Sequence, residues 1–143
     1  MAQRPEYVVE TDFLFGLRAS DRLHSSVYSA MVRHVEGGLH LLVSGASPVE
    51  ANAVMASQGV PQEDIAEAFS LIATTLQKHR VERFTCITIS DVQDAMSSRQ
   101  SRPSLTFFDS LHAAISKRMD LPILSSDPIY RELGVEWVDL RGY

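Results

Sequence analysis

Short apolar runs alternate with segments of helical periodicity along almost the whole chain. The runs are apolar on both faces for most of their length, as in strands buried within a sheet: 7–9, 39–43, 84–89, 123–124 and 136–140. Between them, apolar residues recur at spacings of three and four, the period of amphipathic helices: 13–17, 24–36, 47–57, 62–79, 90–96, 106–119 and a short helix after Pro128. This alternation predicts an α/β fold with a parallel sheet covered by helices on both sides.

The composition is that of an ordinary globular domain. The 143 residues, 45% of them hydrophobic, predict a single domain over residues 1–143. The sequence has no apolar run of about 18 residues, the length that spans a membrane. Its first ten residues lack the apolar core of a signal peptide, so we expect a cytoplasmic protein.

Cys86 is the only cysteine, which excludes an internal disulfide and a cysteine zinc cluster. The net charge of −5 argues against a general polyanion binder, but it is compatible with a nucleic-acid enzyme that binds cations.

Five acidic residues stand where the predicted strands end or where a helix begins on the same edge. Glu10 and Asp12 follow the first strand, Glu50 the second and Asp127 the run at 123–124, while Asp109 opens the helix over 106–119. The carboxyl ends of parallel strands meet at one edge of a sheet, where ligands bind. Converging carboxylates repel one another unless a cation or shared protons offset the repulsion. Such oxygen ligands suit Mg²⁺ or Mn²⁺, ions that activate water and stabilise the leaving oxyanion in phosphodiester hydrolysis.

Each acid also has a purely structural explanation. The alternatives are a capping box for Glu50 with Ser47, N-caps for Asp12 and Asp127, complementation of a helix dipole for Asp109, and solvent exposure for Glu10. Caps alone would use serine, threonine and asparagine as readily as acids. The set as a whole therefore favours a metal site over five separate caps.

Four motifs resemble those of the PIN domain, the nuclease fold of VapC-type toxins and of several RNA-processing enzymes. They are ETDFL at 10–14, SPVE at 47–50, FDSLHAA at 108–114 and ILSSD at 123–127. Their order and spacing match over nearly the whole chain, from about residue 7 to residue 140. The resemblance implies a three-layer α/β/α sandwich with a central parallel sheet. It also implies a metal-dependent endoribonuclease acting on single-stranded RNA.

Each of the five acidic residues can be compared with the residue that the family has at the same position of its motifs. Glu50, Asp109 and Asp127 fall on the family's acidic positions, while Glu10 stands where the family usually has aspartate and Asp12 where it has asparagine or serine. The implied catalytic set is Glu10, Asp12, Glu50, Asp109 and Asp127, with Mg²⁺ or Mn²⁺ held by Glu10, Asp12, Asp109 and Asp127. Residues two apart on a strand share a face, so residues 10 and 12 are both expected to reach the site. The register makes Glu10 the ligand and Asp12 its support; Asp12 as the ligand is the alternative.

Three further features are less specific. His112 either orients a carboxylate or a water, or is a packed helix histidine. Ser125 stands where the family often has a hydroxyl that steadies the last aspartate. Arg99 and Arg102 lie in a predicted polar loop over 97–103, where they either contact RNA phosphates or remain solvated.

The helical stripes over 24–36 and 62–79 are expected to be core. The resemblance implies that part of this surface forms a homodimer or holds a cognate antitoxin. The main rival function is a catalytically inactive PIN-like module that serves as an RNA- or protein-binding subunit. A receiver-like phosphoacceptor lacks the lysine it would need after the last strand, where Arg141 is the only basic residue, and no glycine-rich nucleotide loop is present.

Overall fold

The centre of the molecule is a four-stranded, all-parallel sheet, described by a computed structural model over residues 2–143. The strand order is β2-β1-β3-β4, with β1 at Glu6–Val9, β2 at His40–Val43, β3 at Ile123–Ser125 and β4 at Trp137–Asp139. In register, Val9 pairs with Val43 on one side and with Leu124 on the other. The predicted parallel sheet is confirmed, and all four strands end at the same edge.

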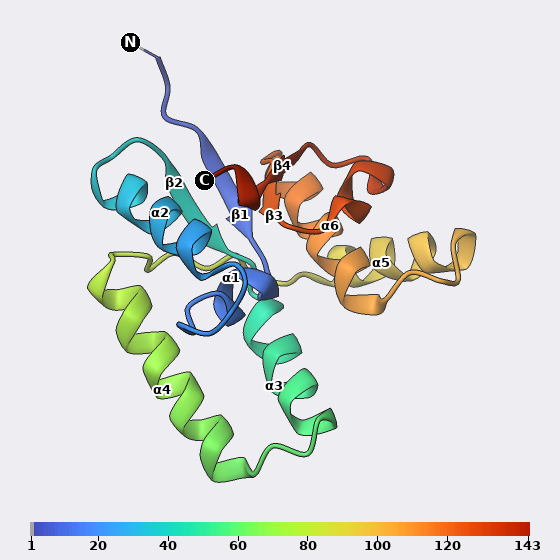
Figure 1. Cartoon of the computed structure of the whole chain (residues 1–143). Helices are drawn as coiled ribbons and strands as arrows, with labels where there is room; N and C mark the ends of the chain where they lie inside the picture. The colour runs from blue at the N-terminus through green and yellow to red at the C-terminus, as the bar shows by residue number, and fades with distance from the viewer. Residues whose placement is uncertain (1) are drawn as a thin grey trace.

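Helices cover both faces of this sheet. The α-helices are α1 (Thr11–Phe15), α2 (His24–Val35), α3 (Ser47–Ser57), α4 (Gln62–Lys78), α5 (Ile89–Ser101) and α6 (Phe107–Met119). Two short 3-10 helices, η1 (Pro128–Leu133) and η2 (Leu140–Gly142), follow β3 and β4. Figure 1 shows α1 and α2 on one side of the sheet and α5 and α6 on the other. The architecture is the predicted three-layer α/β/α sandwich.

The two cores follow from the alternation of side chains along the strands. Val9 and Leu124 face the core shared with α1 and α2, where Phe13 and Met31 are fully buried. Ile123, the neighbour of Leu124, points to the opposite face and packs in a second core with residues of α6 and η1. Because β1 and β3 are buried on both faces, short runs of consecutive apolar residues are enough to place them at the centre of the sheet.

The predicted strand over 84–89 is wrong except for one bridge. Phe84 makes a single parallel bridge to Val43 of β2, and the chain then leaves the sheet. Thr88 caps α5 in a capping box, accepting from the Asp91 N–H while the Asp91 carboxylate accepts from the Thr88 N–H. This strong local helix start ends any strand before it can pair further, so Phe84 and Ile87 stay exposed.

Helix α5 also runs past the predicted end at residue 96. Residues 97–101, predicted as a polar loop, are helical and lie mostly on the solvent side. Ala95 is buried in a small core shared with Leu111 and Ile115 of α6. Packing on α6 therefore extends a helix whose polar sequence alone does not indicate one.

Helices α3 and α4 extend away from the sheet as a pair (Figure 1). Only Ser47 and Ala51 of α3, and Ile65 and Leu76 of α4, are buried. The expectation that the stripe over 62–79 is core therefore holds only near the two ends of α4. Over residues 2–143, no helix combines the length and the apolar character that crossing a membrane requires.

Candidate metal site

One cleft of about 420 Å³ lies at the carboxyl edge of the sheet and brings all five predicted acids together. Its lining residues are Glu10, Thr11, Asp12, Phe15, Arg22, Glu50, Val54, Asp109, Ser126, Asp127 and Pro128. The acids come from the end of β1, from α1, α3 and α6, and from the turn after β3. Segments more than one hundred residues apart in sequence therefore meet here because parallel strands end at one edge.

Glu10 and Asp12 converge for a reason other than the predicted one. Glu10 closes β1 in an extended conformation, but α1 begins directly at Thr11, so Asp12 lies in a helical turn and not on a strand. Alternation along a strand therefore does not bring residues 10 and 12 together, and the predicted N-cap at Asp12 is also wrong, since Glu10 holds the N-cap position. Glu10 is also buried, which excludes solvent exposure as its explanation.

Two serines at the end of β3 bind these two carboxylates. Ser125 Oγ lies 2.9 Å from Glu10 Oε1 and 3.2 Å from Asp12 Oδ2. Ser126 donates to the same Asp12 Oδ2 from its N–H at 2.7 Å and from its hydroxyl at 2.8 Å. Asp12 Oδ1 is buried and has no hydrogen-bond partner within residues 2–143. A buried acceptor left without a donor is suited to a cation.

Glu50 is held by side chains of the site instead of capping α3. Its Oε1 accepts hydrogen bonds from Thr11 Oγ1 and from His112 Nε2, the latter at 2.8 Å. The predicted capping box is wrong: Ala46 is the N-cap of α3, no side chain bonds to the helix start, and Ser47 Oγ is buried without a partner in the described chain. Burial raises the pKa of Glu50, but the hydrogen bonds from His112 and Thr11 outweigh burial and leave that pKa below its usual value. Glu50 is therefore ionised at neutral pH.

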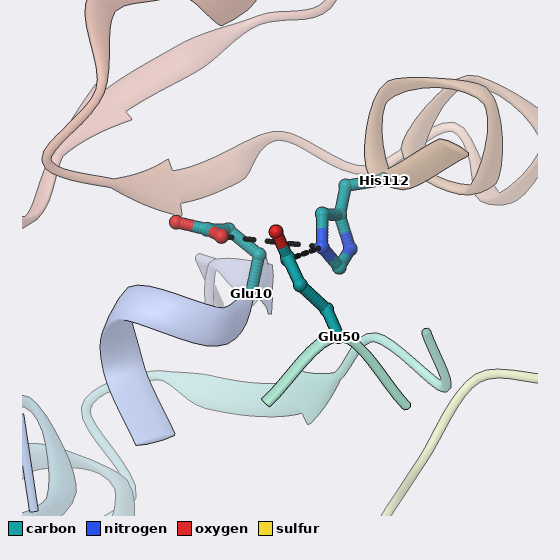
Figure 2. A group of neighbouring side chains, drawn as sticks. All are labelled: Glu10, Glu50 and His112. Carbon is teal, nitrogen blue, oxygen red and sulfur yellow. Dashed lines mark hydrogen bonds and ion pairs between the residues drawn. The ribbon is translucent and has the colours of Figure 1, made fainter. Parts of the chain in front are cut away.

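His112 is fully buried, and Figure 2 shows its ring beside the carboxylate of Glu50, which lies between His112 and Glu10. Its Nδ1 lies 2.7 Å from Ser44 Oγ, and its Nε2 lies 2.8 Å from Glu50 Oε1 and 4.0 Å from Glu10 Oε2. The carboxylate beside Nε2 assigns the proton to that nitrogen, which leaves Nδ1 to accept from Ser44. Ligand atoms of Glu10, Glu50 and His112 all lie within 4.8 Å of one another. The geometry matches the alternative in which His112 orients a carboxylate.

Asp109 faces the cleft from the first turn of α6. Thr106 caps this helix by accepting from the Asp109 N–H at 3.1 Å, so the Asp109 carboxylate is not the cap. The buried hydroxyl of Tyr130 lies 3.5 Å from Asp109 Oδ1. Burial, together with the charges of Asp127 and Glu50, raises the pKa of Asp109.

Asp127 is both a cap and a cleft residue. Its Oδ1 accepts from the Ile129 N–H at 3.0 Å, which confirms the predicted N-cap before Pro128. It is also exposed and lines the cleft. Ser125 Oγ accepts from the Asp127 N–H at 3.1 Å. The same hydroxyl therefore contacts both the backbone of Asp127 and the carboxylate of Glu10.

The electrostatics of the cleft favour a bound cation. Burial raises the pKa of Glu10 well above its usual value, and the neighbouring carboxylates of Asp12 and Glu50 raise it further. A divalent cation would offset this repulsion, and the oxygen-rich donor set with the orphaned Asp12 Oδ1 fits Mg²⁺ or Mn²⁺.

Sequence patterns missed several residues of the site and misplaced two others. Arg22, Thr11, Ser44, Ser126 and Tyr130 are brought to the acids by the tertiary fold, and only Thr11 and Ser126 lie beside a recognised acid. Arg99 and Arg102 do not line the cleft: Arg99 bonds to the Leu105 carbonyl, and Arg102 pairs with Glu132. The predicted loop over 97–103 is wrong for Arg99, which lies in α5, while Arg102 is the C-cap of that helix.

Solved structures of similar shape include VapC-type proteins. No protein-family model matches this sequence, and no curated protein matches it either. PAE2754 from Pyrobaculum aerophilum has a TM-score of 0.64 at 18% identity, covering 98% of this chain and 94% of its own. VapC20 from Mycobacterium tuberculosis, a sarcin–ricin loop cleaving toxin, has a TM-score of 0.62 at 16% identity, covering 90% and 95%.

A third structure extends this likeness to a toxin–antitoxin pair. VapBC2 from Rickettsia felis, bound to a DNA fragment from its promoter, has a TM-score of 0.69 at 9% identity, covering 93% of this chain and 97% of that one. Identities this low establish the fold and leave the chemistry to the site itself. The chain has the fold of a PIN domain, as its four sequence motifs predict.

Proposed function

We propose that this chain is a divalent-metal-dependent endoribonuclease that hydrolyses phosphodiester bonds in single-stranded RNA. The observation that carries the proposal is the convergence of five carboxylates in one cleft at the carboxyl edge of the sheet. The likeness in fold to VapC20, a toxin that cleaves the sarcin–ricin loop, supports the same chemistry. A cluster of repelling acids lowers stability and is best explained by a function that needs a cation.

In this proposal Glu10, Asp12, Asp109 and Asp127 hold Mg²⁺ or Mn²⁺, with Glu10 as a direct ligand and Asp12 as its support. When bound, the metal lowers the pKa of a water and stabilises the leaving oxyanion. Glu50 stays ionised and keeps one oxygen on Thr11 and His112. Its other oxygen, which takes part in neither bond, is left to orient the attacking water and accept its proton.

Replacing His112 with leucine is expected to weaken Mn²⁺ binding by about ten- to a hundredfold, because His112 Nε2 also lies 4.0 Å from Oε2 of Glu10, the proposed ligand, and residues that orient a metal ligand typically contribute that much. His112→Gln retains an N–H donor towards Glu50 and should recover part of the affinity. Calorimetric titration with Mn²⁺ measures both variants. Wild-type affinity in His112→Leu would reduce the role of His112 to packing.

The same proposal extends to partners and setting. We propose that residues 1–143 form a single PIN-like domain that works in the cytoplasm as the toxin of a toxin–antitoxin pair and forms a homodimer. The likeness in fold to VapBC2 and to a toxin–antitoxin complex from Klebsiella pneumoniae supports an antitoxin partner. Apolar side chains exposed on and before α5 offer surface for a protein partner: Phe84, Ile87, Ile89, Val92 and Met96.

The function is tested by incubating the protein with end-labelled single-stranded RNA, the same sequence as DNA, and a fully paired RNA duplex, each with Mn²⁺. We expect internal cuts in the single-stranded RNA and little cleavage of the other two. Binding of RNA without any cleavage would favour the inactive RNA-binding module. Neither binding nor cleavage over a varied set of RNAs would contradict the proposal.

A further inference from the structure

Within residues 2–143, Arg22 is the one cationic residue that lines the cleft, together with five acidic residues. It nevertheless forms no ion pair within 4.0 Å of any acid in residues 2–143. Its Nη2 instead donates to Ser126 Oγ at 3.3 Å. An arginine placed only to neutralise the acids would be expected to pair with one of them directly.

The backbone around Arg22 is fixed, so its position is a property of the fold. Asp21 Oδ1 accepts from the Leu23 N–H at 2.9 Å, which shapes the turn between α1 and α2. Leu23 is buried in the main core, and the His24 ring bonds through Nδ1 to the Gly16 carbonyl at 3.0 Å. Anchors on both sides hold Arg22 at the rim of the cleft.

Ser126 stands between the guanidinium and the acids. Its hydroxyl donates to Asp12 Oδ2 at 2.8 Å and accepts from Arg22. The guanidinium is thereby held one hydroxyl away from the carboxylates. A guanidinium has five N–H donors in a planar fork that matches the oxygens of a phosphate. Arg22 is exposed, and within the described part of the chain its guanidinium makes one hydrogen bond, so most of these donors remain free there.

We propose that Arg22 is a substrate-binding residue that contacts a non-bridging oxygen of a backbone phosphate in the bound RNA strand, next to the metal site. This inference rests on the proposed nuclease function. Without Arg22, an approaching phosphate would meet only acidic and neutral lining residues besides the metal. A phosphate contact accounts for a guanidinium that lies beside the acids without pairing with them.

The test measures binding of a 2′-O-methylated single-stranded RNA, checked to remain intact in Mn²⁺, at several salt concentrations. Arg22→Gln is expected to weaken binding at least about tenfold, the usual scale for one charged hydrogen bond. The slope of log affinity against log salt should fall by about 0.7, the value for one phosphate contact on a single strand. Arg22→Lys, which keeps the charge but not the fork, should lie between Arg22→Gln and the wild type.

Arg18→Gln is the matched control, because Arg18 is an exposed arginine of the same turn that does not line the cleft. We expect Arg18→Gln to change affinity less than about threefold. Calorimetric Mn²⁺ binding by Arg22→Gln should stay at or above the wild-type affinity, since the change removes a positive charge near the site.

The outcomes separate this inference from the proposed function. Wild-type RNA affinity and an unchanged salt slope in Arg22→Gln overturn the phosphate contact and leave the nuclease proposal standing. Tighter Mn²⁺ binding with unaltered RNA affinity also overturns it and makes Arg22 a charge-balancing residue. A wild type that binds neither RNA nor Mn²⁺ overturns both.

Discussion

Asp109→Asn is expected to lower the rate of RNA cleavage at least about a hundredfold, the scale on which the loss of one electrostatic catalytic group acts. The substitution keeps the size of the side chain and removes its charge. The backbone cap of α6 stays intact, because Thr106 Oγ1 accepts from the N–H of residue 109 whichever side chain stands there. Initial rates in saturating Mn²⁺ measure the effect, with Asp94→Asn on the exposed side of α5 as the control.

The same variant should leave the metal-free protein as stable as the wild type or more stable. Burial, Asp127 and Glu50 raise the pKa of Asp109, so folding favours its protonated form. The stability linked to this proton is present below the unfolded pKa and is lost as pH rises through the folded pKa. Asparagine stays neutral throughout, so the gain in melting temperature should appear near pH 8 and vanish near pH 4. Full activity in Asp109→Asn would rule out Asp109 as a metal ligand.

Glu10→Gln is expected to weaken Mn²⁺ binding on the order of a hundredfold and to reduce cleavage with it, whereas Asp12→Asn should be mild. Glu10 is the buried acid nearest to Glu50 and His112, and its charge is the one the metal would need directly. Asp12 Oδ2 is already engaged by Ser126. An asparagine at residue 12 keeps an oxygen for Ser126 and removes one of the negative charges that act on Glu10.

Calorimetric Mn²⁺ titration of these two single variants distinguishes three arrangements of the first acid. A strong loss in Glu10→Gln alone supports Glu10 as the ligand. The reverse ranking would transfer that role to Asp12, whose orphaned Oδ1 is then the ligand atom. Unchanged affinity in both would favour the inactive module. Mn²⁺ should also raise the melting temperature of each variant, and the size of the rise should follow the Mn²⁺ affinities, because a ligand that binds the folded state stabilises it.

Most of the fold could be predicted because its elements carry strong local patterns. Strand β3 is only three residues long, yet Ile123 and Leu124 face opposite cores, and a run apolar on both faces indicates a central strand. The run over 84–89 looks similar in sequence. It makes a single bridge because its partner strand β2 ends at Val43, the residue that pairs with Phe84, and the capping box at Thr88 then starts α5.

The acids of the candidate site could be predicted because topology gathers strand ends at one edge, a rule that needs only the order of elements. Local patterns were less reliable. Ser47 and Glu50 have the spacing of a capping box, but Glu50 turns to Thr11 and His112 instead. Arg22 and Ser44 carry no local signal at all, since each reaches the site through a contact between segments that are distant in sequence.

The most direct measurement is cleavage of a single-stranded RNA by one preparation of the wild type that is first treated with a chelator and then titrated with Mn²⁺, beside Asp109→Asn purified in the same way. We predict that the chelator abolishes cleavage by the wild type and that added Mn²⁺ restores this activity in a saturable manner. Asp109→Asn should cleave at least about a hundredfold more slowly than the wild type at every Mn²⁺ concentration. Cleavage that survives the chelator, or that is equal in the two proteins, would contradict a metal-dependent site built from these carboxylates.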